Sequence, residues 1–290
     1  MRAIFQWNVG SRVLELGRRT LIMGVVNVTP DSFSDGGLYI DAEKAVVRAE
    51  QLLDDGATII DVGGESTRPG ASEPVSEEEE RRRVLPVIRD LKRRRPDAVV
   101  SVDTYKATVA RAAVELGAEV VNDVSGFRWD PKMAKTLAEL KVGAVLMHTR
   151  GRPEEWRSLP PIGDPVLLVK RELRQWAEAA TLAGIKRDRL VLDPGFGFGK
   201  RFEENYPLLA HFAELQQVGF PLLAGVSRKS FIGRTLARDG KDAEVAERLY
   251  GTLAAETGLI LKGVHIIRTH DVRFAVEAAR VADAIVANGG

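Results

Sequence analysis

Cysteine is absent from the 290 residues of the chain, which excludes disulfide bridges, thiolate nucleophiles, cysteine-rich zinc sites and iron–sulfur clusters. Long apolar runs are absent too, since no segment has about 18 consecutive apolar residues, the length that a membrane-spanning helix needs. The N-terminus lacks the apolar run and the small-residue cleavage site of a signal peptide. These absences predict a cytoplasmic protein.

An excess of one charge is also missing, because 42 Lys and Arg residues stand against 41 Asp and Glu residues. A formal net charge of +1 gives no reason to expect a nucleic acid or an anionic membrane as the main partner. With 44% hydrophobic and 29% charged residues, the chain has the composition of an ordinary globular protein that can bury a sizeable core. Any anion site must therefore be local.

Eight short runs rich in Val, Ile and Leu predict buried β-strands, at residues 21–28, 58–62, 99–102, 119–124, 144–147, 190–192, 221–226 and 264–267. Longer segments between them repeat an apolar residue every three or four positions, as helices do, for example at residues 42–53, 107–116, 133–140 and 245–261. Apolar strands that alternate with helices form parallel sheets covered by helices. Eight such units predict a closed (β/α)8 TIM barrel of the α/β class.

The alternative fold is an open, doubly wound sheet, but no Gly-x-Gly-x-x-Gly motif follows the first predicted barrel strand. No change of composition and no flexible linker divides the chain, so we expect a single domain over residues 1–290. Ahead of the barrel, residues 3–7 and 12–16 are joined by Asn8-Val-Gly-Ser11 and predict a β-hairpin. We expect this hairpin, within residues 1–17, to cap the barrel floor.

A run of four Glu and three Arg residues extends from Glu77 to Arg83. Its residues have the spacing of favourable i,i+4 ion pairs along one helix. We therefore expect a solvated helix face there and no anion site.

Polar residues follow the end of nearly every predicted strand, the edge where a barrel carries its active site. Any one of them, such as Asp103 or Asp271, can equally be explained as the cap of the next helix. Together, buried carboxylates and amides at one mouth cost about 1–3 kcal/mol each unless a ligand or water pairs with them. The set predicts a ligand rich in hydrogen-bond donors, and it consists of Asn27, Asp61, Asp103, Asn122, Met147-His148, Asp193, Ser227-Arg228-Lys229 and Arg268-Thr-His270-Asp271.

One part of this set suits a flat heterocycle. Asp103, Asn122 and Asp193 offer oxygen acceptors and one amide for amino and ring N–H groups, and Lys229 can donate to a ring carbonyl. Two further side chains can supply apolar faces for such a ring, and these are Met147 and Phe198.

A second group of residues is cationic and predicts an anion site. Arg68, Arg268 and His270 are donors with no partner nearby in the sequence, and Arg268 and His270 lie in the part of a barrel that often binds phosphate. Asn27 adds a neutral oxygen ligand suited to Mg²⁺. Arg68 stands in a Pro-Gly loop, where an arginine is also often only solvated.

The sequence does not match several well-known functional motifs. Pro194 to Arg201 is Gly-rich but has Pro194 in place of the first Gly of a Walker A loop and Arg201 in place of its hydroxyl residue. The four histidines have no metal-ligand spacing, and a packing role is the simpler explanation for His211 and His265. No Gly-x-Ser-x-Gly elbow is present, which argues against a serine hydrolase.

Seven motifs in order resemble those of the dihydropteroate synthase family, and the resemblance covers nearly the whole chain. The first two separate this family from the related methyltetrahydrofolate-dependent methyltransferases, which share the barrel and the pterin pocket. The motifs are Asn27-Val-Thr-Pro-Asp-Ser-Phe-Ser-Asp-Gly-Gly37, Asp61-Val-Gly-Gly-Glu-Ser-Thr-Arg-Pro-Gly70, Ser101-Val-Asp-Thr-Tyr105, Asn122-Asp-Val-Ser-Gly126, Asp193-Pro-Gly-Phe-Gly-Phe-Gly-Lys200, Ser227-Arg-Lys-Ser230 and Arg268-Thr-His-Asp271.

This resemblance implies the condensation of 6-hydroxymethyl-7,8-dihydropterin pyrophosphate with 4-aminobenzoate to 7,8-dihydropteroate and pyrophosphate, with Mg²⁺ as cofactor and a homodimer as the assembly. It implies pterin contacts from Asp103, Asn122, Met147, Asp193, Phe198, Gly225 and Lys229. It implies pyrophosphate contacts from Asn27, Arg68, Arg268 and His270, with the metal on Asn27. It implies aminobenzoate contacts from Phe33, Thr67, Pro69 and Ser230, and catalytic roles for Asp103, Lys229, Asp35 and Arg68.

The implied reaction has a loose, SN1-like transition state, because the electron-rich dihydropterin can delocalise the developing cation. The polar loop from Thr29 to Gly37 is then expected to act as a lid that carries Phe33 and Asp35. The sequence departs from the family after His148, where Thr149-Arg-Gly-Arg-Pro153 and Trp156 replace the usual residues. A methyltetrahydrofolate-dependent methyltransferase and a non-catalytic pterin-binding paralogue are the alternatives.

Overall fold

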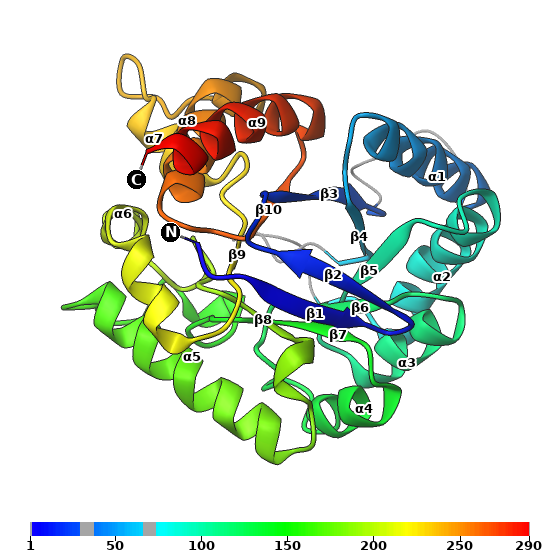
Figure 1. Cartoon of the computed structure of the whole chain (residues 1–290). Coiled ribbons are helices and arrows are strands. Elements are labelled where there is room, and N and C mark those ends of the chain that lie inside the picture. The colour runs from blue at the N-terminus through cyan, green and yellow to red at the C-terminus, as the bar shows by residue number, and fades with distance from the viewer. Residues whose placement is uncertain (1, 30–37, 66–73, 290) are drawn as a thin grey trace.

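Eight parallel strands form a barrel in this computed structural model, which describes residues 2–29, 38–65 and 74–289 (Figure 1). Their order in the sheet, β8-β7-β6-β5-β4-β3-β10-β9, follows the sequence around a circle. A parallel bridge between Leu192 and Leu222 joins the two ends and closes the circle, as the sequence predicted. The strands are β3 (Leu21–Asn27), β4 (Ile59–Gly63), β5 (Val99–Asp103), β6 (Val120–Asp123), β7 (Gly143–Met147), β8 (Leu190–Asp193), β9 (Leu223–Ala224) and β10 (Ile266–Thr269).

Helices surround the barrel on its outside (Figure 1). They are α1 (Leu38–Asp54), α2 (Glu77–Arg94), α3 (Ala107–Glu115), α4 (Met133–Leu140), α5 (Pro165–Leu182), α6 (Asn205–Ala210), α7 (Ser230–Thr235), α8 (Leu249–Leu261) and α9 (Val272–Asn288). Short 3-10 helices lie at Pro153–Glu155, Arg187–Arg189, Phe212–Val218 and Val245–Arg248. The predicted helix at residues 245–261 therefore begins as a 3-10 turn and continues as α8. Among the described residues, no helix combines the length and the apolar character required to cross a membrane.

The predicted hairpin is present and lies across one end of the barrel (Figure 1). Strands β1 (Phe5–Val9) and β2 (Arg12–Leu16) pair so that Val9 faces Arg12, which leaves a turn of two residues. The first strand was predicted two residues too early. Gly10 has a φ of +66°, a conformation that permits this tight turn and lets β1 continue to Val9.

Side chains from the hairpin and the strands form an inner cluster at the barrel floor. Its buried members are Trp7, Val9, Leu16, Leu21, Met23, Ile59, Val99, Val120, Val145, Val191, Leu223 and Ile266. The indole Nε1 of Trp7 donates to the carbonyl oxygen of Arg189 at 2.8 Å, so its polar atom is satisfied. A separate, larger cluster lies between the strands and the helices. Within the described residues the floor is thus closed, which leaves the opposite end of the barrel to admit a ligand.

The charged run at the start of α2 is only partly the solvated face that was predicted. Ser76 caps this helix by accepting from Glu79 N at 3.2 Å, and four Glu residues in the first turn suit the positive end of the helix dipole. Glu79 pairs with Arg83 at 2.9 Å, as predicted. Glu80, however, is only 1% exposed, because helix periodicity turns it toward the barrel.

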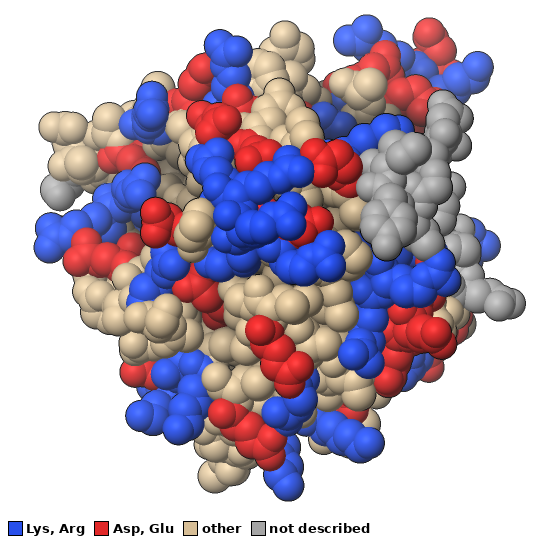
Figure 2. All heavy atoms as spheres, turned by 90° about the vertical axis from the view of Figure 1, so that its right-hand side faces the viewer, with Lys and Arg blue, Asp and Glu red and all other residues tan. Residues whose placement is uncertain are grey.

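The outer faces of α1 and α2 carry interleaved charges. Figure 2 shows Lys and Arg side chains close to Asp and Glu side chains on this side of the molecule. Arg94 pairs with Glu43 at 2.6 Å, and Arg95 pairs with Asp54 at 2.9 Å. Exposed pairs of this kind contribute about 0–1 kcal/mol each. They leave no reason to assign an anion site to this face.

Candidate active site

The open end of the barrel gathers inward-facing side chains from eight strands or strand ends. Successive strand residues point alternately into the barrel and toward the helices, so positions two or four residues beyond the floor cluster also face inward. These positions are Asn27, Asp61, Asp103, Asn122, Met147, Asp193, Gly225 and Arg268. The structure therefore brings these eight residues, all named from the sequence, to one mouth.

Arg268 joins two carboxylates at this mouth. Its Nε donates to Asp61 Oδ2 at 2.6 Å, and its Nη2 donates to Asp103 Oδ2 at 2.7 Å. The sequence had suggested no partner for Arg268 and had placed it in an anion site apart from Asp103. The structure brings the two groups into contact, because the interior of an eight-stranded barrel is narrow enough for a long side chain on β10 to reach β4 and β5.

Asp61 fixes the orientation of the Asn122 amide. Asp61 is fully buried and its Oδ2 also accepts from Asn122 Nδ2 at 2.9 Å. An ionised carboxylate only accepts, so the amide nitrogen of Asn122 must face it and the carbonyl Oδ1 is presented elsewhere. Within the described residues no donor reaches Asp61 Oδ1. The sequence noted Asp61 at a strand end but assigned it no contact.

Several ionisable side chains at the mouth have pKa values far from their ordinary values. Burial raises the pKa of Asp103 to about 7, although the charge of Arg268 opposes this shift. Burial also raises the pKa of Asp193, against the charge of Lys229. It lowers the pKa of Lys229 to about 7, while Asp193 acts in the opposite direction. Titratable groups perturbed together in one concave region are typical of functional sites.

Lys229 and Phe198 lie against each other beside Asp193. The ammonium of Lys229 donates to the carbonyl oxygen of Phe196 and lies 4.4 Å from the centroid of the Phe198 ring. The Gly-rich turn that carries Phe198 starts with Gly195, whose N–H donates to Asp193 Oδ1 at 2.7 Å. One wall of the mouth therefore combines a cation, a carboxylate and an aromatic face.

Lys200 holds this Gly-rich turn in place, a role that the sequence did not reveal. Its Nζ donates to the carbonyl oxygens of Gly195 at 2.8 Å and Phe198 at 3.2 Å. Burial lowers the pKa of Lys200 to about 7, and the charge of Lys229 acts in the same direction. The position of Lys200 at the end of the Gly-rich segment could have indicated this role. The sequence analysis considered that segment only as a possible Walker A loop and rejected it.

His148 lies outside the mouth, although the sequence counted it among the polar strand ends. It follows Met147 and therefore faces the helices, where its Nε2 is 3.0 Å from Glu172 Oε2 on α5. Its Nδ1 is 3.0 Å from Lys200 Nζ, and its ring stacks on Trp176 with centroids 5.1 Å apart. Burial and the charge of Lys200 lower the pKa of His148 to about 3, so the ring is neutral at pH 7. Its role is to connect α5 to the Gly-rich turn.

The loop whose sequence departs from the family packs on the same turn. Arg150 Nη1 donates to the carbonyl oxygen of Gly199 at 3.2 Å, and Arg150 Nη2 donates to that of Pro160 at 3.0 Å. The Trp156 ring meets the Phe198 ring edge to face, with centroids 5.4 Å apart. The unusual residues thus support Phe198 from behind.

The segments after β9 and β10 meet at the rim. His270 Nδ1 lies 3.0 Å from Ser227 Oγ, which also accepts from His270 N at 3.2 Å. Arg228 donates to both carboxyl oxygens of Asp271, at 2.9 and 2.5 Å. Asp271 precedes α9 but makes no side-chain cap, so the capping alternative for this residue was wrong. Ser230, predicted as an aminobenzoate contact, begins α7 and is exposed.

Asp103 is not a helix cap either. Helix α3 has Lys106 at its N-cap, with no cap from that side chain, and Ala107 N donates to Asp130 Oδ2 at 2.8 Å. Asp103 is therefore left for the ion pair with Arg268 and for a ligand.

Metal ligands are few in the described residues. No group of three or more His, Cys, Asp and Glu side chains there could hold a metal ion alone. Asn27 faces the mouth with a neutral oxygen, which fits an ion that is bound mainly by substrate phosphates and water. Five predicted site residues fall outside the described residues, and these are Phe33, Asp35, Thr67, Arg68 and Pro69.

Comparison with known proteins agrees with this geometry. The family model described as pterin binding enzyme matches residues 23–270. A dihydropteroate synthase of Synechocystis sp. is 42% identical over 277 residues, which cover 96% of this chain and 94% of that protein.

Two solved structures are similar over almost their full length. A Xanthomonas albilineans dihydropteroate synthase with 4-aminobenzoic acid has a TM-score of 0.89 and 42% identity, covering 98% of this chain and 99% of that one. A Yersinia pestis dihydropteroate synthase in complex with a sulfonamide drug has a TM-score of 0.88 and 39% identity, covering 98% of this chain and 100% of that one. The chain belongs to the dihydropteroate synthase family of pterin-binding enzymes.

Proposed function

We propose that this protein condenses 6-hydroxymethyl-7,8-dihydropterin pyrophosphate with 4-aminobenzoate to form 7,8-dihydropteroate and pyrophosphate. The observation that carries this proposal is the cluster of Asp103, Asn122, Asp193 and Lys229 at the end of the barrel opposite the closed floor. The proposal also rests on the family to which the chain belongs.

The pterin ring is recognised by complementary hydrogen bonds. Its amino and ring N–H groups meet acceptors, namely the carbonyl Oδ1 of Asn122 and the carboxylates of Asp103 and Asp193. Its ring carbonyl accepts from Lys229. Arg268 uses only Oδ2 of Asp103, so Oδ1 of that carboxylate remains for the ring. Met147 and Phe198 supply the apolar contacts.

The leaving pyrophosphate is stabilised by cations at the same rim. Arg268 has five N–H donors and commits Nε and one Nη2 hydrogen to Asp61 and Asp103, which leaves others for the leaving oxygens. His270 adds donors on this side, and Arg68, which lies outside the described residues, is proposed from the family resemblance to bind the same pyrophosphate. Mg²⁺ held by Asn27 and the phosphates would neutralise part of the charge of the pyrophosphate.

The bond changes then proceed without a strong protein nucleophile or base. The C–O bond to pyrophosphate breaks with both electrons leaving on oxygen, and the positive charge on carbon spreads into the dihydropterin ring. The buried carboxylates of Asp103 and Asp193 stabilise this cation electrostatically. The amine of 4-aminobenzoate forms the new C–N bond and loses one proton to solvent.

A turnover assay tests this function directly. The purified protein is incubated with Mg²⁺, the pterin pyrophosphate and labelled 4-aminobenzoate, and dihydropteroate is measured for the wild type and for Asp103→Asn. We expect product from the wild type, strongly reduced product from the variant, and competition of a sulfonamide with 4-aminobenzoate. Pterin binding without any product would favour a methyltransferase or a binding protein instead.

The protein is further proposed to act as a homodimer built from single-domain chains of residues 1–290. Apolar side chains on α8 and α9 face solvent in the single chain, including Tyr250, which is 82% exposed, Phe274, Val281 and Ile285. A second copy that covers these side chains would remove them from water. Light scattering after size-exclusion chromatography should give about twice the mass of one chain, and the mass of one chain would contradict this assembly.

A further inference from the structure

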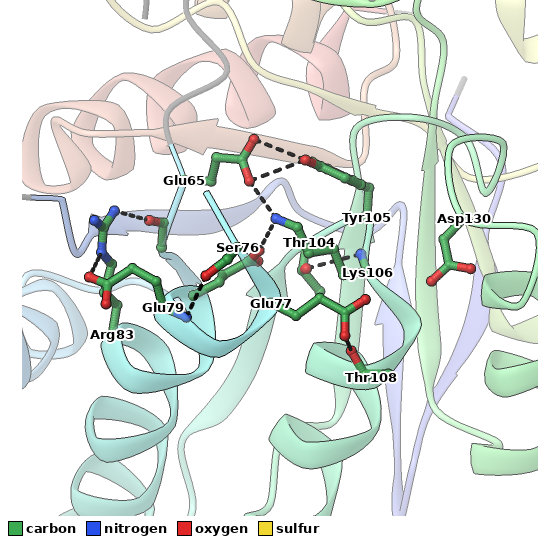
Figure 3. A network of polar contacts seen from close by, with 12 residues as sticks. Glu65, Ser76, Glu77, Glu79, Arg83, Thr104, Tyr105, Lys106, Thr108 and Asp130 are labelled. Atoms are coloured by element: carbon green, nitrogen blue, oxygen red, sulfur yellow. Dashed lines mark hydrogen bonds and ion pairs between the residues drawn. The ribbon is translucent and has the colours of Figure 1, made fainter. Parts of the chain in front are cut away.

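A buried lysine connects both flanks of residues 66–73. This segment joins the end of β4 to the start of α2. It contains Thr67, Arg68 and Pro69, which are expected to contact the aminobenzoate and the pyrophosphate. Its flanking residues are within the described part of the chain, with Glu65 before it and Pro74 after it. Figure 3 shows the polar contacts between these flanks and the residues that follow β5.

Lys106 bridges one carboxylate from each flank. Its Nζ donates to Glu65 Oε2 at 2.5 Å, on the entering side. The same Nζ donates to Glu80 Oε2 in the first turn of α2, on the leaving side. The side chains of Lys106, Glu65 and Glu80 are 10%, 13% and 1% exposed, so the three charges are largely shielded from water.

Further contacts make the bridge rigid. The hydroxyl of Tyr105 donates to Glu65 at 3.1 Å, and the Lys106 ammonium lies 4.4 Å from the centroid of the Tyr105 ring. Arg83 Nη1 donates to the carbonyl oxygen of Gly64 at 2.8 Å. A Cβ on Gly64 would lie 2.9 Å from Val84, so the chain runs closely along α2 at this point. Each flank is therefore held by side chains that are themselves fixed.

A bridge of this kind is better suited to fixing geometry than to adding stability. Taking three charges out of water costs much of what their attraction returns, and well-packed apolar residues often stabilise a fold as well or better. Two carboxylates that share one ammonium do, however, hold their backbones at a fixed separation. Lys106 also follows Asp103 by three residues, so the bridge relates both flanks to the carboxylate of the mouth.

We propose that Lys106 is a positioning residue for the reaction: through Glu65 and Glu80 it holds the two flanks of residues 66–73 in register with Asp103. This proposal rests on the proposed function, because it assigns to the bridge the placement of the second substrate and of the leaving group. Lys106 itself does not contact the pterin.

Two changes test the bridge without leaving an unpaired ion in the core. Glu65→Ala removes the entering contact and keeps Lys106 paired with Glu80, and Lys106→Met combined with Glu65→Gln and Glu80→Gln removes all three buried charges together. Lys106→Arg keeps the bridge and is the conservative variant. Arg111→Met breaks an exposed pair with Glu139 on the neighbouring surface and serves as the matched control.

Two quantities are measured for each variant: KM and kcat with 4-aminobenzoate, and the Kd of 6-hydroxymethyl-7,8-dihydropterin without pyrophosphate. We expect a rise of about tenfold or more in the aminobenzoate KM, or a similar loss of kcat, in the first two variants, with the pterin Kd changed less than about twofold. Lys106→Arg and Arg111→Met should resemble the wild type.

Wild-type kinetics in the two bridge variants would overturn the proposal. So would a parallel loss of pterin binding and aminobenzoate use that follows a fall in melting temperature, since this is the result of a purely structural role. A wild type that forms no dihydropteroate would contradict the proposed function itself, and the positioning role with it.

Discussion

Replacing Arg268 by methionine is expected to destabilise the protein by removing the only counter-charge that contacts Asp61 within the described residues. Asp61 is fully buried and Arg268 is 21% exposed, so solvent screens the pair only weakly. Methionine keeps much of the side-chain volume, which limits the effect of a cavity. The perturbation therefore isolates the charge.

The expected magnitude follows from the burial of the pair. Removing one partner of a buried ion pair costs about 3–5 kcal/mol, because the other charge is left uncompensated. Because the Arg268 side chain is 21% exposed, we expect a loss of unfolding free energy near the lower limit of this range, at about 3 kcal/mol. For a chain of this size, about 2 °C per kcal/mol corresponds to a fall of about 6 °C in melting temperature.

Urea unfolding followed by circular dichroism measures this change. Arg268→Met combined with Asp61→Asn also removes the charge of Asp61, and it should recover the part of the free energy of unfolding that an uncompensated Asp61 costs; Asp103, which loses the same partner, is unchanged in both variants. The exposed pair Arg111–Glu139 provides the control, and Arg111→Met should cost less than about 1 kcal/mol. Equal stability of the wild type and Arg268→Met, or no recovery in the double variant, would refute the view that Arg268 is the counter-ion of a buried Asp61.

Three further outcomes are expected. The pKa of Asp103 is raised to about 7, so its carboxylate is lost as an acceptor below that pH. Lys229 also has a pKa of about 7 and gains its donor as pH falls, so the wild type should lose more pterin affinity between about pH 8 and 6 than Asp103→Asn, in which only the Lys229 contribution remains, and equal pH profiles in calorimetric titrations would contradict the role of Asp103. Trp7→Ala should cost about 3–5 kcal/mol in urea unfolding with an unchanged aminobenzoate KM, because Trp7 fills the floor far from the mouth, and a changed KM would contradict that separation. Burial raises the pKa of Glu256 from 4.5 to about 8, so the stability that its protonated form contributes is complete below about pH 4.5 and is lost as pH rises through 8. Glu256→Gln should therefore lose less stability than the wild type between about pH 6 and 9. Parallel curves of unfolding free energy against pH for the two proteins would exclude this explanation.

Local patterns in the sequence were sufficient for the barrel and for most of its mouth. The apolar runs such as Leu21 to Asn27 are buried on both faces, so they form continuous hydrophobic segments in the sequence. Eight such runs that alternate with helices match the requirement of a closed (β/α)8 barrel. When one side chain of a strand points into the barrel at the floor, the side chains two and four residues later also point into the barrel. The polar strand ends Asn122, Asp193 and Arg268 could therefore be named before their distances were known.

The partners of those residues depended on the tertiary structure. Arg268 contacts Asp61 and Asp103 inside the barrel, although both lie more than 160 positions before it in the sequence. No local sequence pattern predicts a contact between residues so far apart in the chain. His148 was counted with the mouth because its position in the chain is right, but the two-residue repeat of a strand turns it toward Glu172.

The bridge at Lys106 shows the same division. The sequence determined that α2 would be a helix with acidic residues in its first turn, since capping and i,i+4 spacing act between near neighbours. Only packing against the barrel decided that Glu80 would be buried and would share Lys106 with Glu65. Short-range rules follow from backbone geometry, whereas the pairing of buried charges depends on which distant segments the closed barrel brings within hydrogen-bonding distance.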